Sequence, residues 1–205
     1  MTKEKILDTA QELIQTRSFH GFSFQDIADE VGVRKPSLYH YFDSKDAIAL
    51  AVLERSKDWV RAQFAEVDGK DPATRLERYF EMFRGLHGKA ERMCPGGSFG
   101  ALFDAVSSSV QAALHRFAKL HLDLVEGIVR DGAERGQFQI RDQRPREVAM
   151  QIVAGIQGAL LMGRLTGDSH FIDAVAGEFR SYLGYAPTAK TSRQRRKPKI
   201  SAAAT

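Results

Sequence analysis

Apolar side chains recur every three or four residues along most of the chain, which is the spacing of one face of an α-helix. The first such segment carries Ile6, Leu7, Ala10, Leu13 and Ile14. Alternation with a period of two, which would predict strands, is sparse, and no internal repeat is visible. The pattern therefore predicts an all-α protein of about nine helices.

Residues that favour turns divide this pattern into segments. Helices are expected at about 2–20, 23–31, 36–42, 44–67, 73–90, 99–106, 110–135, 145–165 and 171–183. The segments Asp-Gly-Lys-Asp-Pro at 68–72 and Cys-Pro-Gly-Gly-Ser at 94–98 are expected to be loops. From residue 188 onward the composition turns to Thr, Ser, Lys, Arg and Ala, which predicts a disordered tail.

The net charge of +4 arises at the C-terminal end of the sequence. The segment 188–205 holds six basic side chains and no acidic one, so residues 1–187 carry a net charge of −2. We expect the basic tail to be a solvated, solubilising segment, although it could add nonspecific attraction to DNA. Binding of nucleic acid by the folded part would therefore depend on where individual basic groups lie.

Several classes of protein are excluded or disfavoured by composition. A single cysteine cannot form an internal disulfide, and the N-terminal segment lacks the apolar run of a secretory signal. The most apolar stretch, Val148 to Gly163, is interrupted by Gln151 and Gln157 and is shorter than the ~18 residues that a membrane span needs. We expect a soluble protein of the cytosol without membrane contact.

Residues 24–45 have the spacing of a helix-turn-helix, in which two short helices are joined by a tight turn. Ala28 is small where the two helices approach, and Gly32 can adopt the left-handed backbone of the turn. Leu38 can anchor the second helix to the core. Three steric requirements are thus met at the correct offsets, which predicts a DNA-binding unit.

The second helix of this unit would present groups that suit the major groove of DNA. They are Lys35, Ser37, Tyr39, His40 and Tyr41. Lysine can contact guanine or phosphate, hydroxyl groups can bond phosphate oxygens, and aromatic edges can touch thymine methyl groups. Arg34, Lys35 and Lys45 are expected on the same face. The alternative is a helical hairpin in which Tyr39 and Tyr41 are merely packed.

The run GFSFQDIADEVGVRKPSLYHYFDSKDAIALAVLE, residues 21–54, resembles the DNA-binding domain of the TetR family of bacterial transcriptional repressors. The resemblance includes an LYxYF-x-S/N-K segment at Leu38 to Lys45. It implies a homodimer that binds a palindromic operator and is released by a small molecule in its C-terminal domain. The expected domains are 1–45 for DNA binding, 46–187 for ligand binding and dimerisation, and 188–205 for the basic tail.

The resemblance also carries over DNA-contacting positions residue by residue. The matching positions are Gln25, Lys35, Pro36, Ser37, Tyr39, His40, Tyr41 and Lys45. Lys45 matches the lysine that clamps a phosphate at the start of the fourth helix, where free backbone amides also favour an anion.

Aromatic and polar side chains of the C-terminal region are candidates for an effector pocket, which the resemblance places among these helices. The candidates are Tyr79, Phe83, His87, Phe99, Phe103, Phe117, His121 and Gln157. Such a pocket would be apolar with a few polar groups that orient a hydrophobic or aromatic molecule. The alternative is that these side chains form the ordinary core.

Cys94 lies between basic residues and the glycines of its loop. Lys89 and Arg92 could lower the pKa of its thiol, as in cysteines that sense oxidants or electrophiles. No second cysteine is available to resolve a sulfenic acid within the chain, so the favoured interpretation is an ordinary structural thiol.

Small residues recur in the penultimate helix, and apolar residues recur in the last one. The expected dimer interface consists of Ala154, Gly155, Gly158, Ala159, Phe171, Val175 and Phe179. Small side chains let helices approach closely, which suits a four-helix interface made by two helices of each subunit. Burial inside one subunit would give a similar pattern.

Two other functional classes are alternatives to a DNA-binding regulator. An enzyme is disfavoured because the sequence has no Glu-x-x-His repeat, no HExxH, no glycine-rich phosphate loop and no metal-ligand spacing among its six His. We expect no cofactor and no metal. A helical interaction module that has lost DNA binding is the other alternative, although no part of the motif is missing.

Overall fold

The computed structural model describes residues 2–87 and 92–186, with the side chains of His87 and Ala101 outside this description. The described part holds eight α-helices and one 3₁₀ helix and no strand, which confirms the predicted all-α class. The elements are α1 (Thr2–Arg17), α2 (Phe24–Val31), α3 (Lys35–Leu38), α4 (Lys45–Ala65), α5 (Pro72–His87), η1 (Gly97–Ala105), α6 (Ser108–Glu134), α7 (Pro145–Thr166) and α8 (Phe171–Leu183).

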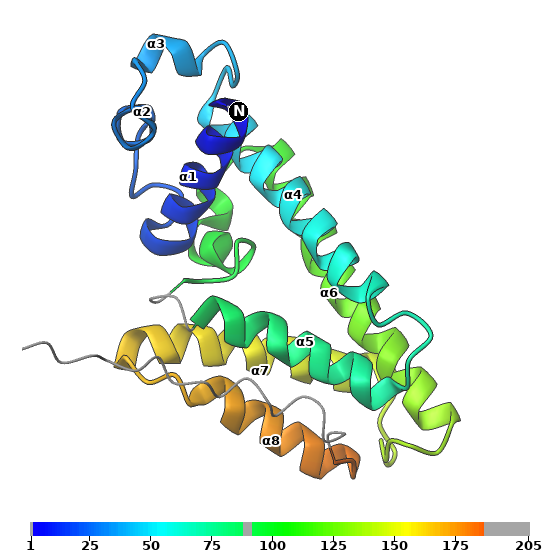
Figure 1. The fold of residues 1–205 in the computed structure, drawn as a ribbon. Coiled ribbons are helices and arrows are strands. Elements are labelled where there is room, and N and C mark those ends of the chain that lie inside the picture. The colour runs from blue at the N-terminus through cyan, green and yellow to red at the C-terminus, as the bar shows by residue number, and fades with distance from the viewer. Residues whose placement is uncertain (1, 88–91, 187–205) are drawn as a thin grey trace, which may run out of the picture.

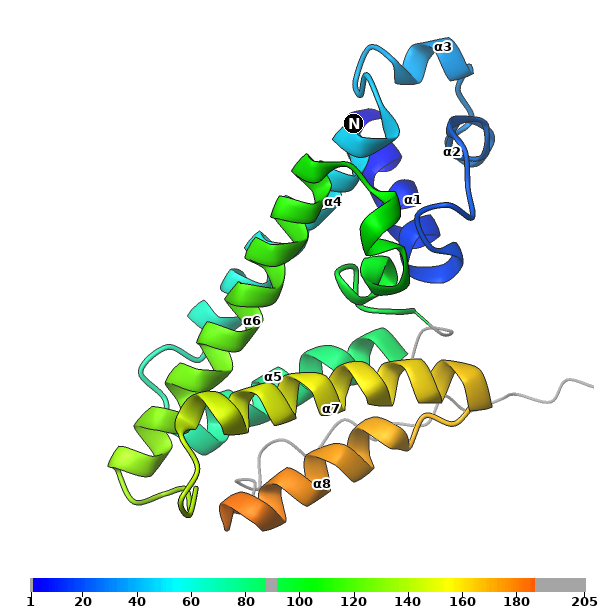
Figure 2. The same cartoon turned by 180° about the vertical axis from the view of Figure 1, so that it is seen from behind.

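Helices α1, α2 and α3 form a small unit at one end of the molecule (Figure 1). The long helices α4 and α6 run side by side away from this unit, and α5, α7 and α8 form a layer at the other end. Seen from behind, η1 (green) lies beside the C-terminal half of α1, on the side of the N-terminal unit that faces this layer (Figure 2). Helix α4 therefore connects the two parts, since it packs against both α1 and α6.

The first turn of α4 is fixed by the side chain of Ser44, whose Oγ accepts a hydrogen bond from the Ala47 amide at 3.1 Å. Ile48, Ala49 and Val52 on the following turns are fully buried. Arg55 of α4 reaches across to α1, where it donates to Asp8 and Gln11. The N-terminal unit is thus joined to the rest of the subunit by packing and by polar contacts.

Helix α7 has the length and apolar composition that a membrane span would need. In the structure it packs against α5, α6 and α8, and Val148, Ile152, Ile156 and Leu160 are buried on this side. The apolar residues on this side of α7 belong to the core of the helical bundle.

One element differs clearly from its prediction. The second helix of the helix-turn-helix was expected to reach residue 42, but α3 ends at Leu38. The amides of Tyr41 and Phe42 both donate to the Leu38 carbonyl, at 2.9 Å each, so the chain leaves the helix in a tight turn. The end of the helix expected at 73–90 falls on residues 88–90, and the predicted tail on 188–205, both outside the described residues.

Candidate DNA interface and ligand pocket

The turn between α2 and α3 has the geometry that its sequence requires. Ser23 caps α2 with a reciprocal pair of hydrogen bonds to Asp26, which also lower the pKa of that carboxyl. Gly32 adopts φ 78°, and the amides of Gly32 and Val33 donate to the Ala28 carbonyl at 2.9 and 3.0 Å. Ala28 and Leu38 are both fully buried. The predicted helix-turn-helix is therefore present.

Leu38 is the buried residue of α3, and most other side chains of α3 and of the turn after it are exposed to solvent. Tyr39 and Tyr41 are 53% and 41% exposed, which disfavours the alternative of merely packed tyrosines. Gln25, Arg34, Lys35, Pro36 and His40 are exposed, and Ser37 is partly exposed. One edge of the Tyr39 ring rests on Phe24, with ring centroids 4.9 Å apart. The predicted DNA-contacting residues between positions 34 and 41 are thus presented to solvent on α3 and the segments that flank it.

Two of these predicted positions have partners within the chain. The Gln25 amide donates to Asp29 at 2.7 Å, which fixes it on the surface of α2. Lys45 donates to the Phe22 carbonyl, and its ammonium lies 4.9 and 4.2 Å from the ring centroids of Phe19 and Phe22. Partial burial lowers the pKa of Lys45. In this structure the Lys45 ammonium therefore faces its own domain, and a phosphate contact by Lys45 stays a prediction.

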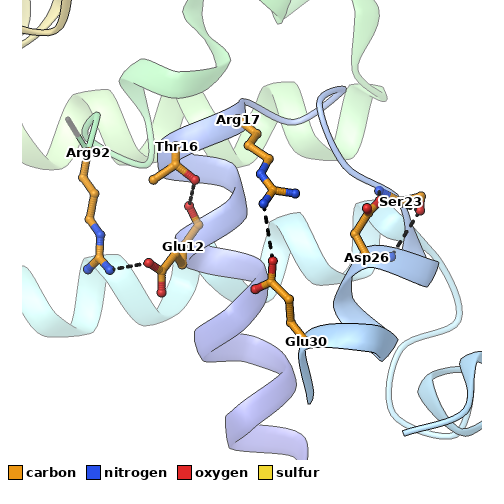
Figure 3. A network of polar contacts seen from close by, with 7 residues as sticks. All are labelled: Glu12, Thr16, Arg17, Ser23, Asp26, Glu30 and Arg92. Carbon is orange, nitrogen blue, oxygen red and sulfur yellow. Dashed lines mark hydrogen bonds and ion pairs between the residues drawn. The ribbon is translucent and has the colours of Figure 1, made fainter. Parts of the chain in front are cut away.

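Three acidic side chains of the N-terminal unit are paired with arginines, and Figure 3 shows two of these pairs. Glu12 accepts from Arg92 at 2.7 Å, and Glu30 lies 3.5 Å from Arg17. Asp8 accepts from Arg55 at 2.6 Å. These pairs involve three of the seven acidic side chains in positions 1–45, whereas Arg34 and Lys35 beside α3 are exposed.

A pocket of about 580 Å³ lies between the N-terminal unit and the helical bundle. Its lining comes from α1, α4, α5, α6 and the segment 92–95. Phe83, Phe117 and His121 are buried members of this lining, whereas Asp8, Arg55 and Arg92 are its charged members. This volume is in the range of small-molecule sites.

The structure places the predicted pocket residues in different surroundings. Phe83, Phe117 and His121 line the pocket. Tyr79 is fully buried behind it, 3.4 Å from His121. Phe99 packs on Phe19, and Phe103 packs on His115, both away from the lining. Gln157 lies beside Gly97 with its Oε1 buried and unpartnered, and the side chain of His87 is outside the described residues.

Sequence reasoning missed the contribution of α1 and α4 to this lining. Asp8, Gln11 and Gln15 face the pocket from α1, and Trp59 faces it from α4. Gln15 is 2% exposed, and its side chain donates to the Met93 carbonyl at 3.0 Å. A signal was available, because Asp8, Gln11 and Gln15 have the i, i+3, i+7 spacing of a polar stripe beside the apolar face of α1.

The prediction that basic neighbours lower the pKa of the Cys94 thiol is wrong. Cys94 is 2% exposed, and burial raises the pKa of its thiol despite hydrogen bonds from nearby amides. Arg92 is engaged with Glu12, and Lys89 is outside the described residues. The segment is buried because Met93 exchanges backbone and side-chain hydrogen bonds with Gln15. These contacts favour the structural thiol over a reactive one.

One face of α7 is apolar and exposed in the described chain. Its members share a spacing of three or four residues: Met150, Ala154, Gly158, Leu161 and Leu165. Leu161 is 48% exposed and Leu165 is 70% exposed. A Cβ added at Gly158 would meet nothing within 4 Å, so this position is open. We call these five residues the α7 stripe.

The other predicted interface residues lie beside the α7 stripe or inside the subunit. Phe171, Val175 and Phe179 of α8 are partly exposed. A Cβ at Gly155 would lie 3.1 Å from Val175, so Gly155 serves the approach of α8 to α7 within the subunit. Ala159 is 3% exposed and faces the core. Sequence reasoning found Ala154 and Gly158 of the stripe but missed its larger members.

Within residues 2–87 and 92–186, no three His, Cys, Asp or Glu side chains come together as metal ligands.

Comparison with known proteins gives matches along most of the chain. Residues 6–52 match the model of bacterial regulatory proteins of the tetR family, and residues 72–179 match a tetracyclin repressor-like C-terminal domain. An uncharacterised HTH-type transcriptional regulator of Lactococcus lactis subsp. lactis is 28% identical over 84% of this chain and 88% of its own. The HTH-type transcriptional repressor DhaR of Mycobacterium sp. strain GP1 is 25% identical over 83% and 86%.

The fold has a close counterpart among solved structures. A TetR transcriptional regulator from Legionella pneumophila superposes with a TM-score of 0.82 and 26% identity, over 89% of this chain and 97% of the other.

Proposed function

Because the chain belongs to the TetR family of bacterial regulatory proteins, we propose that it is a cytoplasmic repressor of transcription that binds a palindromic operator as a homodimer. A small molecule in the pocket beside α1 would release it from DNA. The family assignment makes the protein a helix-turn-helix regulator of transcription, and its relatives act in regulation rather than catalysis.

The exposed surface of α3 carries this proposal. Leu38 fixes the helix to the core, while Lys35, Tyr39 and Tyr41 stand out beside it. A lysine and two half-exposed phenols can reach phosphate and base edges in a major groove. Such a surface at the free end of a rigid unit suits insertion into DNA.

The α7 stripe supports the homodimer. Exposed apolar side chains aligned on one helix face favour burial against a second copy, and α8 adds Phe171 and Phe179 beside it. A two-fold dimer would set its α3 helices about 34–36 Å apart, one turn of DNA. This spacing is why the operator should be palindromic.

The position of the pocket supports release by a ligand. Its lining includes Gln11 and Gln15 of α1 and Arg55 of α4, which are also contacts between the N-terminal unit and the bundle. A molecule that binds here with different affinity in the two states would shift α1 and α4 and change the separation of the α3 helices. The relative DhaR is named a repressor, which favours repression over activation for this chain.

Selection of duplexes from a random pool, followed by gel-shift titration with nonspecific competitor, tests DNA binding. We expect enrichment of a palindrome and a competitor-resistant shift. Lys35→Ala should weaken binding and lower the salt slope by about two per dimer, because each subunit loses one phosphate neutralisation. Lys119→Ala, which removes an exposed lysine on α6, is the matched control and should change neither. Failure to enrich any sequence would favour an interaction module without DNA binding.

A further inference from the structure

One residue of the pocket lining has a buried polar atom without a protein partner. His121 is 4% exposed and lines the pocket, and its Nε2 has no hydrogen-bond partner within the described residues. An unsatisfied buried donor or acceptor is costly, so such an atom in a pocket wall indicates a place where a ligand makes a hydrogen bond.

The neighbouring Tyr79 contacts the other ring nitrogen of His121, so the tautomer of the imidazole depends on which of the two groups donates. The Tyr79 hydroxyl lies 3.4 Å from Nδ1 of His121. Burial raises the pKa of Tyr79 well above its usual value and lowers the pKa of His121 to about 4, so both groups are neutral near pH 7. When the phenol donates to Nδ1, the imidazole proton resides on Nε2. His121, a residue of the pocket lining, then carries an N–H donor that has no protein partner.

The surroundings of this donor are aromatic and uncharged. The rings of Phe83 and Phe117 lie 5.9 and 4.7 Å from the His121 ring, measured between centroids. The charged lining residues are already paired, Arg55 with Asp8 and Arg92 with Glu12. A ligand that brought its own charge to the inner end would lose hydration without gaining a counterion.

We infer that the pocket binds a neutral, mainly apolar molecule with one hydrogen-bond acceptor, such as a ketone, ester or amide carbonyl, to which His121 Nε2–H donates. This assignment rests on the proposed role of the pocket as the effector site and specifies its ligand class. A molecule of the same shape without the acceptor leaves the donor unsatisfied and binds more weakly.

Two isosteric pairs of compounds test the assignment on the full-length protein without DNA. Each pair exchanges a ketone oxygen for a methylene group: acetophenone with α-methylstyrene, and benzophenone with 1,1-diphenylethylene. Trp59 is the single tryptophan of the chain and lines the pocket, so the NMR signal of its indole N–H reports occupancy of this site. We expect each ketone to bind about tenfold more tightly than its alkene.

Two variants link this preference to His121. His121→Phe keeps a ring but removes the donor, and both members of each pair should then bind equally. His121→Gln retains an amide donor and should retain part of the preference. Thermal unfolding of both variants checks that they are folded.

Equal binding of ketone and alkene by the unaltered protein, absence of any shift of the Trp59 signal, or a preference that survives in His121→Phe would overturn the assignment. Gel-shift titration of the same preparation separates this outcome from failure of the proposed function, because DNA binding by the free protein does not depend on the ligand class.

Discussion

Arg164 of α7 donates a hydrogen bond to the carbonyl of Thr16, in the last turn of α1. A second donor of the same guanidinium reaches the Gln15 carbonyl at 3.3 Å. The last carbonyls of a helix lack partners within it and carry the negative end of its dipole, so a cation there is stabilising. The helix that carries the exposed apolar stripe is thereby joined to the first helix of the DNA-binding unit.

Replacement of Arg164 tests the strength of this connection. We expect Arg164→Met to lower the free energy of unfolding by about 1 kcal/mol, since two carbonyls lose a charged donor. Arg164→Lys should lose less. Urea denaturation measures the difference, and Arg61→Met, at an exposed arginine of α4, is the control. An Arg164→Met variant as stable as the parent protein would show that the contact contributes nothing.

The α7 stripe predicts the oligomeric state. Leu161→Glu combined with Leu165→Glu places two charges in the proposed interface, so the mass in sedimentation equilibrium should fall from that of a dimer to that of one chain. The fold should persist because both side chains are exposed in the single subunit. Ala62→Glu with Ala118→Glu adds the same charges at exposed positions of α4 and α6 and should leave the dimer intact. A dimer that survives the leucine changes would locate the interface elsewhere.

The buried His121 predicts a dependence of stability on pH. Burial lowers its pKa from 6.5 to about 4, so the unfolded chain binds a proton more readily than the folded one. The histidine therefore does not lower the free energy of unfolding above pH 6.5, but it does so progressively as the pH falls below that value. At pH 4 the loss amounts to about 3 kcal/mol. The other titratable groups around the ring, Tyr79 and Cys94, stay neutral in this range.

Comparison of unfolding free energies between pH 7 and pH 4 isolates this effect. His121→Phe should show a shallower decline than the parent protein, whereas His115→Gln, at an exposed histidine, should follow the parent. Parallel curves for His121→Phe and the parent would mean that the imidazole is charged in the folded state.

Glu77 of α5 is 3% exposed and accepts two hydrogen bonds from Arg180 of α8, both at 2.7 Å. Arg180→Met leaves the buried carboxylate without its counterion, and we expect a loss of roughly 3–5 kcal/mol in the free energy of unfolding. Glu77→Met combined with Arg180→Met should recover most of it, since no isolated charge remains. Urea denaturation of the parent protein, Arg180→Met and the double variant measures these free energies. A double variant no more stable than Arg180→Met would refute the explanation.

Local chemistry made the helix-turn-helix predictable. The Ser23 and Asp26 cap, the left-handed Gly32 and the anchor Leu38 each depend on neighbours within a few residues, and the structure contains all of them. The end of α3 was not predictable at this level. Apolar and aromatic residues continue to Phe42, and nothing in their spacing shows that the chain turns at Tyr39.

The pocket and the surroundings of Cys94 depend on contacts between distant segments. Gln15 and Met93 are 78 positions apart, and their hydrogen bonds hold the loop in which Met93 and Cys94 are buried. The α7 stripe was only partly predictable for a related reason. Leu165 is exposed and Leu160 is buried, but the sequence does not distinguish the two leucines, because their burial depends on where the neighbouring helices lie.

Hydroxyl-radical footprinting of the duplex enriched from the random pool tests the central claim most directly. A dimer that presents two α3 helices should protect two equivalent half-sites about 34–36 Å apart, on one side of the DNA, symmetrically about the centre of the palindrome. A single protected patch, or protection without a fixed sequence, would contradict operator binding by a two-fold homodimer.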